Sequence, residues 1–73
     1  MNPVFTFDTT HHALWAEEIA RDTGIPHEVV AAPPAANASC SIAIETLTEE
    51  EGRLSTALSS VGIHFRIFRP ASP

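Results

Sequence analysis

Apolar and polar residues follow the same pattern twice along this chain: a short apolar run, a helical stretch and a second apolar run. In the first round, the apolar runs span residues 4–7 and 27–32 and flank a helical stretch over residues 11–23. In the second round, they span residues 42–47 and 63–69. Short runs rich in β-branched and aromatic residues are typical of strands, so the pattern predicts the order β-α-β-β-α-β.

Local signals set the limits of the two predicted helices. Residues 8–10, Asp-Thr-Thr, supply side-chain oxygens that cap a first turn, and Gly24 suits the left-handed position after a helix. Thr48 and Glu51 form a capping box for the second helix, which Gly62 ends. Each helix carries one apolar stripe at helical spacing: Ala13, Ala16, Ile19 and Ala20 in the first, and Leu54, Ala57, Leu58 and Val61 in the second.

This order of elements predicts an α+β sandwich of the ferredoxin-like kind. Two interleaved right-handed crossovers give a four-stranded antiparallel sheet in the order 4-1-3-2, with both helices on one face. All 73 residues are expected to form a single domain, with a core over about residues 4–69 and a tail over 70–73. A domain of this size buries only about 60% of its unfolded surface, so we expect self-association, as a homodimer, to compensate.

The charge balance narrows the class of partner. Nine acidic residues face four arginines and no lysine, for a net charge of −5, which argues against nucleic acid because phosphate binding needs clustered basic side chains. No apolar run approaches the ~20 residues of a membrane span, and the N-terminus lacks a secretion signal, so we expect a cytoplasmic protein with a reduced thiol. Arg66 and Arg69 are expected on the sheet face without helices, where they would attract an anionic partner.

Cys40 is the one cysteine and lies in a loop of small residues and prolines, residues 33–41, between the second and third predicted strands. The topology brings this loop to the sheet edge where the first helix begins, so Thr10 and His11 are expected near it, with His27 at the opposite edge. The thiolate is the nucleophilic form, and helix N–H groups stabilise it. We therefore predict an exposed, reactive Cys40, with Thr10 as a hydrogen-bond donor and His11 as a neutral donor or proton carrier.

Two sequence motifs carry a resemblance to a known family. Residues 7–14 read Phe-Asp-Thr-Thr-His-His-Ala-Leu and are followed by Glu17, while Pro33 precedes Cys40 by seven residues in a loop that contains Ser39. Both predicted helices also end in Gly-Ile. With these motifs the chain resembles the putative Se/S carrier protein-like family over about residues 4–69.

The resemblance implies a small carrier of sulfur or selenium without a bound cofactor. Cys40 would hold a persulfide that a donor protein such as a cysteine desulfurase supplies and an acceptor protein removes, so any enzymatic activity would be sulfurtransferase-like. The chain departs from the family pattern at Pro34, where arginine is usual, and at Ser41, where glycine is usual.

Two other functions fit the same residues. In the first, the domain is a non-catalytic interaction or regulatory module, Cys40 is incidental and Trp15 contacts a partner or a second copy. In the second, His11, His64 and Cys40 bind zinc or copper, since both ligand types suit these metals. No Cys-x-x-Cys or His-x-x-x-His spacing supports the metal site.

Overall fold

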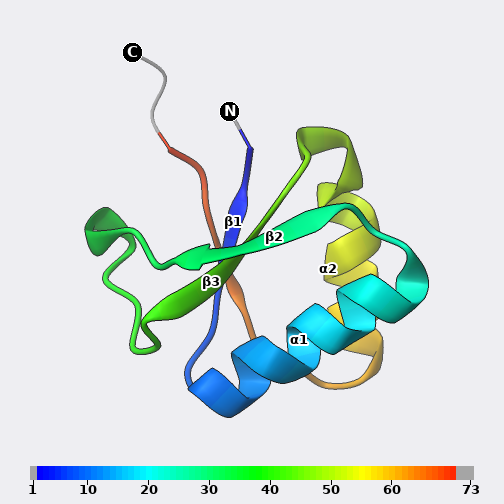
Figure 1. Cartoon of the computed structure of the whole chain (residues 1–73), viewed down its shortest axis with the longest axis horizontal. Coiled ribbons are helices and arrows are strands. Elements are labelled where there is room, and N and C mark those ends of the chain that lie inside the picture. Colours follow the sequence, from blue (N-terminus) through cyan, green and yellow to red (C-terminus); the bar gives the residue numbers. More distant parts are fainter. Residues whose placement is uncertain (1, 71–73) are drawn as a thin grey trace.

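The computed structural model describes residues 2–70, which form four strands, two α-helices and two 3₁₀ turns (Figure 1). Of the predicted tail, residues 71–73 lie outside the described residues. No helix within residues 2–70 is long and apolar enough to cross a membrane. In chain order the elements are β1 (Val4–Thr6), α1 (Thr10–Thr23), β2 (His27–Ala31), η1 (Pro34–Ala36), β3 (Ile42–Thr46), η2 (Thr48–Glu50), α2 (Glu51–Ser60) and β4 (Arg66–Phe68).

The sheet has the strand order β2-β3-β1-β4, and every neighbouring pair is antiparallel. This confirms the predicted α+β ferredoxin-like topology. Thr6, at the end of β1, lies opposite Ala43 of β3 and Arg66 of β4, while Ala31, at the end of β2, pairs with Ile42. The ends of β1 and β2 and the starts of β3 and β4 therefore meet at one edge of the sheet.

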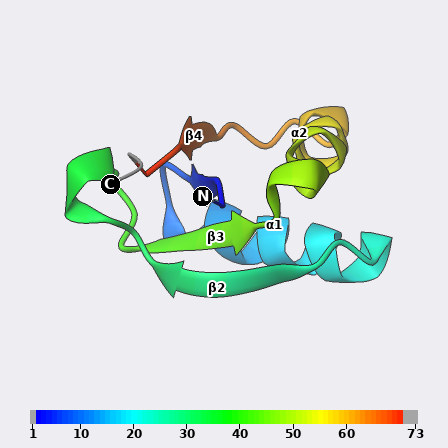
Figure 2. The same cartoon turned by 90° about the horizontal axis from the view of Figure 1, so that it is seen from above.

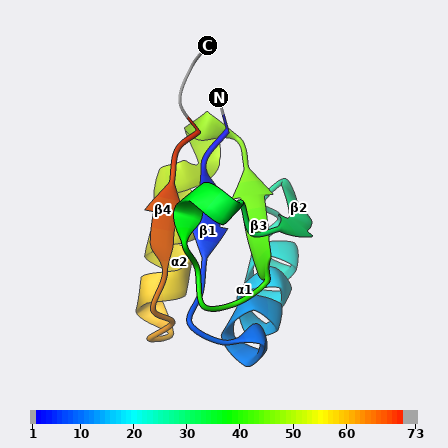
Figure 3. The same cartoon turned by 90° about the vertical axis from the view of Figure 1, so that its left-hand side faces the viewer.

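The two helices cover one face of the sheet, and the loop that contains η1 crosses in front of the other face (Figures 2 and 3). Thr6 is only 4% exposed although its neighbours Phe5 and Phe7 face the helices, which is consistent with cover from that loop. Apolar side chains from the sheet and both helices make the core between the layers. Its buried members are Phe5, Phe7, Ala13, Ala16, Ala20, Ile25, Cys40, Ile44, Leu54, Leu58 and Ile63.

Three details differ from the sequence prediction. The chain from Thr48 to Glu50 forms the 3₁₀ turn η2 rather than the first turn of the helix, and α2 begins at Glu51. Because β1 is three residues long, it gives β4 only three partners, so β4 is shorter than predicted. Val61 is 39% exposed because α2 ends at Ser60, before the predicted stripe is complete.

Gly24 ends α1 as predicted. Its φ of 75° lies in the left-handed region, and its N–H donates to the carbonyls of Ala20 and Arg21. This cap turns the chain back toward β2, so that β1, α1 and β2 form the first crossover.

Candidate functional site

The start of α1 contributes the first half of the site. Thr9 is the N-cap residue, with an extended backbone, and its hydroxyl accepts a hydrogen bond from the backbone N–H of His12 at 3.1 Å. Thr10 is the first residue of the helix, so its side chain lies at the positive end of the α1 dipole.

Cys40 contributes the second half from the loop that precedes β3. Its Sγ lies 3.6 Å from Oγ1 of Thr10, within hydrogen-bond range for sulfur. Either atom donates when Cys40 is a thiol, but only the hydroxyl donates when the sulfur is ionised. The structure thus brings together two of the three predicted site residues at the start of α1.

The prediction of an exposed thiol is wrong. Cys40 is 4% exposed and belongs to the hydrophobic core, together with Phe7 and Ala13. Its side chain is small and weakly polar, so it packs as a small apolar group at the point where the loop returns to the sheet. The hydroxyl of Thr10 is its polar contact in this environment.

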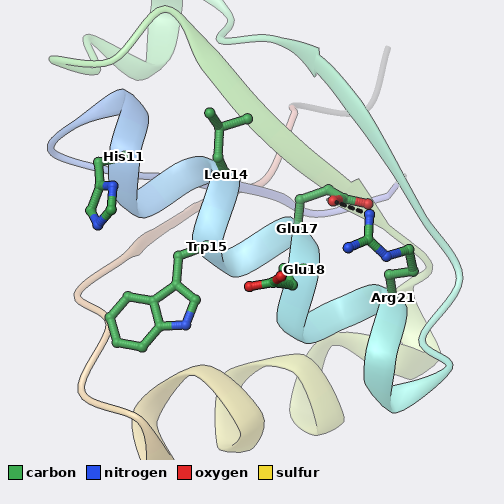
Figure 4. Close-up of a pocket in the computed structure, with 6 residues that line it drawn as sticks. All are labelled: His11, Leu14, Trp15, Glu17, Glu18 and Arg21. Atoms are coloured by element: carbon green, nitrogen blue, oxygen red, sulfur yellow. Dashed lines mark hydrogen bonds and ion pairs between the residues drawn. The ribbon is translucent and has the colours of Figure 1, made fainter.

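His11, the third predicted site residue, lies on the outer side of α1. It lines a groove of about 550 Å³ with Leu14 and Trp15, and Figure 4 shows these side chains projecting from successive turns of the helix. Within residues 2–70 no hydrogen bond joins His11 to Cys40; its ring lies near that of His12, with a centroid distance of 5.9 Å. Among the described residues the structure therefore gives the Cys40 sulfur a polar contact with Thr10 but no hydrogen bond with His11.

The residues of the alternative metal site do not converge. His64 is exposed and lines a different groove, with Gly62 and Phe65. Among the described residues, no group of three or more His, Cys, Asp or Glu side chains is placed to hold a metal ion. The arrangement gives no support to zinc or copper binding by His11, His64 and Cys40.

A cluster around Glu17, far from Cys40, was not predicted from the sequence. His27 begins β2 at the opposite edge of the sheet, and its Nε2 lies 2.9 Å from Oε2 of Glu17, while Nη1 of Arg21 lies 3.1 Å from Oε1. The hydrogen bond from His27, and then the charges of Arg21 and His27, hold the pKa of Glu17 below its usual value. Glu17 and Arg21 have the i, i+4 spacing of a helical ion pair, but sequence spacing gives no signal for His27.

Comparison with known proteins places the chain in a family. The family described as putative Se/S carrier protein-like matches residues 2–69. No curated protein and no solved structure shows a significant match. Because the match covers nearly the whole chain and both halves of the Cys40–Thr10 pair, we conclude that the chain belongs to the putative Se/S carrier protein-like family.

Proposed function

We propose that this protein carries sulfur or selenium on Cys40 and passes it from a donor protein to an acceptor protein. Membership of a family named for Se/S carriage supports this function, and Cys40 is the one thiol in the chain. The observation that carries the proposal is the contact between Cys40 Sγ and Thr10 Oγ1, because it gives the sulfur a hydrogen-bond donor at a helix N-terminus.

Loading is a sulfur exchange that needs no external oxidant. The Cys40 thiol gives its proton to solvent, and the thiolate attacks the terminal sulfur of a donor persulfide. An S–S bond forms on Cys40 while the donor's S–S bond breaks, and the donor leaves as a thiolate. The Thr10 hydroxyl donates a hydrogen bond to the attacking sulfur, and selenium follows the same route from a donor that carries S–Se.

The burial of Cys40 gives the carrier a closed resting state. At 4% exposure the sulfur is shielded from solvent, so residues 37–41 move aside before a donor reaches it. These residues lie outside the regular strands, and three of them, Asn37, Ser39 and Ser41, are exposed.

The outer side of α1 supplies the proposed contact with partner proteins. Leu14 is 56% exposed and Trp15 is 36% exposed, so two large apolar side chains that are neighbours in the sequence line one groove at the surface. His11 lines the same groove and is proposed to take up or release the proton at the surface while a partner is bound. This role is tested by His11→Gln, which should slow transfer from a donor protein and leave alkylation by small reagents unchanged.

Mass spectrometry of the intact protein tests the proposed function. After incubation with glutathione persulfide, or with a cysteine desulfurase and cysteine, the native chain should gain the mass of one sulfur atom, and Cys40→Ser should gain none. A different result would favour the interaction module. In that case the native protein would take up no sulfur, whereas the urea-unfolded protein would be modified at Cys40.

A further inference from the structure

Among residues 2–70, Arg66 is the one arginine whose guanidinium has no partner. Within residues 2–70 its guanidinium forms no ion pair and no hydrogen bond, while its backbone pairs with Thr6 of β1, whose hydroxyl also donates to the Arg66 carbonyl. Arg69 does not share its face as predicted: successive residues along an extended chain point to opposite faces, so residues three apart do too, and Arg69 reaches Glu51 at the start of α2. The paired arginines are Arg21 with Glu17, Arg53 with Glu50, and Arg69 with Glu51.

Asp8 is an acidic residue near Arg66 whose side chain likewise lacks a partner within residues 2–70. Its carboxylate also forms no ion pair and no side-chain hydrogen bond within the described part of the chain. Both residues line one small cavity of about 50 Å³, where the loop after η1 passes in front of β1 and β4 (Figure 3). The full lining is Thr6, Phe7, Asp8, Ala36, Asn37, Ala38, Ser39 and Arg66.

The two oppositely charged residues line the same cavity and are both exposed, and no ion pair joins them within residues 2–70. A simple anion would be attracted by Arg66 and repelled by Asp8. A simple cation would be attracted by Asp8 and repelled by Arg66. A ligand that carries both charges satisfies both residues at once, and charge-assisted hydrogen bonds are the stronger kind. Asn37 and Ser39 add an amide and a hydroxyl to the wall, so the lining suits a polar, zwitterionic group.

The size of the cavity sets the size of that group. A bound water needs roughly 10–15 Å³ of such space, so a volume of about 50 Å³ accommodates a group of about three to five non-hydrogen atoms. The ammonium, α-carbon and carboxylate of an amino acid are a zwitterion of this size. The side chain of such a ligand would extend out of the cavity.

We propose that this cavity binds the head group of an α-amino acid, with Arg66 holding the carboxylate and Asp8 holding the ammonium. The cavity wall includes Ser39, which directly precedes Cys40. An amino acid bound there would therefore contact the loop that covers the thiol. The binding proposal stands on the two unpaired charges and does not depend on sulfur transfer.

Titration of the isotopically labelled full chain with glycine, followed by NMR, tests the site. We expect saturable shifts of the backbone amides of residues 37–39 and of the Nε–H of Arg66. Acetate and methylammonium each carry one of the two charges and should bind about tenfold more weakly, or worse. Ionic strength is held constant with sodium chloride throughout.

Substitutions assign each charge to its partner. Arg66→Gln should remove the preference for glycine over methylammonium, and Asp8→Asn should remove the preference for glycine over acetate. Arg69→Gln makes the same charge change just after the end of β4, outside the cavity wall, and should leave glycine binding unchanged. Circular dichroism checks that each variant is folded, and Arg66→Met, which also removes the positive charge, replaces Arg66→Gln if it is not.

Two results would overturn the proposal. One is a set of shifts that do not saturate or that lie outside the cavity wall, and the other is equal binding of glycine and acetate to the wild-type chain. The failure of Cys40 to take up sulfur would leave both measurements unaffected. The carrier function and the amino-acid site are therefore tested separately.

Discussion

The hydroxyl oxygen of Thr10 lies 3.6 Å from the sulfur of Cys40, although 30 positions separate the two residues in the sequence. The topology explains this contact. Thr10 begins α1 shortly after β1 ends. Cys40 lies two residues before Ile42, the first residue of β3. Because β1 and β3 are antiparallel neighbours, the end of one and the start of the other meet at the same edge of the sheet.

The first prediction concerns the hydroxyl of Thr10. Thr10→Val keeps the shape of the side chain but removes its hydrogen bond to sulfur, so alkylation of Cys40 by iodoacetamide should slow about three- to tenfold. Thr10→Ser keeps the hydroxyl and should react at close to the wild-type rate. Rates are measured by mass spectrometry on the native protein. Equal rates for the valine variant and the wild type would remove Thr10 from the site.

The position of Cys40 along the sheet edge could be predicted from the sequence, but its burial could not. Strand order and direction follow from hydrophobic periods and from crossover rules, and these place Cys40 beside the first turn of α1. Exposure depends on how residues 32–41 fold back over the sheet, which has no periodic signal. Neighbouring helical residues point about 100° apart, so when Thr10 faces the sulfur, His11 is directed elsewhere.

The ion pairs between residues that are distant in the sequence could not be predicted either. Nothing in local spacing brings His27 to Glu17 or Arg69 to Glu51, because each pair joins two elements that pack only in the folded domain. The separation of Arg66 from Arg69 could have been predicted, since residues three apart on a strand point to opposite faces.

Acid titration should reveal the pairing of Glu17 with His27. The pKa of Glu17 is lowered in the folded chain, chiefly by the hydrogen bond from His27, so this pairing stabilises the fold above the unfolded-state value of about 4.3. The contribution is lost as the pH falls through the lowered folded-state pKa. Glu17→Gln should therefore be less stable than the wild type to urea at neutral pH, and the gap should close as the pH falls through the lowered pKa of Glu17.

Glu18 provides the matched control for this experiment. It is the next residue of α1, is exposed and forms no ion pair within residues 2–70. Glu18→Gln removes the same charge but breaks no ion pair, so its stability relative to the wild type should not change with pH in this way. A gap of equal size in both variants would assign the effect to net charge instead of to the contact with His27.

Two glycine substitutions should change stability in opposite directions. Gly24 has a φ of 75°, where a side chain is strained, so Gly24→Ala should destabilise the fold by about 1–2 kcal/mol. Gly52 lies in α2, and a Cβ there would meet no atom within 4 Å, so Gly52→Ala should stabilise the fold by about 0.4–1 kcal/mol. Urea unfolding measures both, and a stabilising Gly24→Ala would contradict the left-handed cap.

Loading of Cys40 should loosen the loop that covers it. The side chain is packed in the core at 4% exposure, so an added sulfur atom overfills its site, and overpacking typically costs about 1–3 kcal/mol. Persulfidation should therefore speed amide hydrogen exchange in residues 37–41 and lower the urea midpoint, while exchange in α2 at its buried Leu54 and Leu58 changes less. Reduction with dithiothreitol should reverse both effects. Unchanged exchange in the loaded protein would mean that the cargo already has room beside Thr10, and that the loop does not open to hold it.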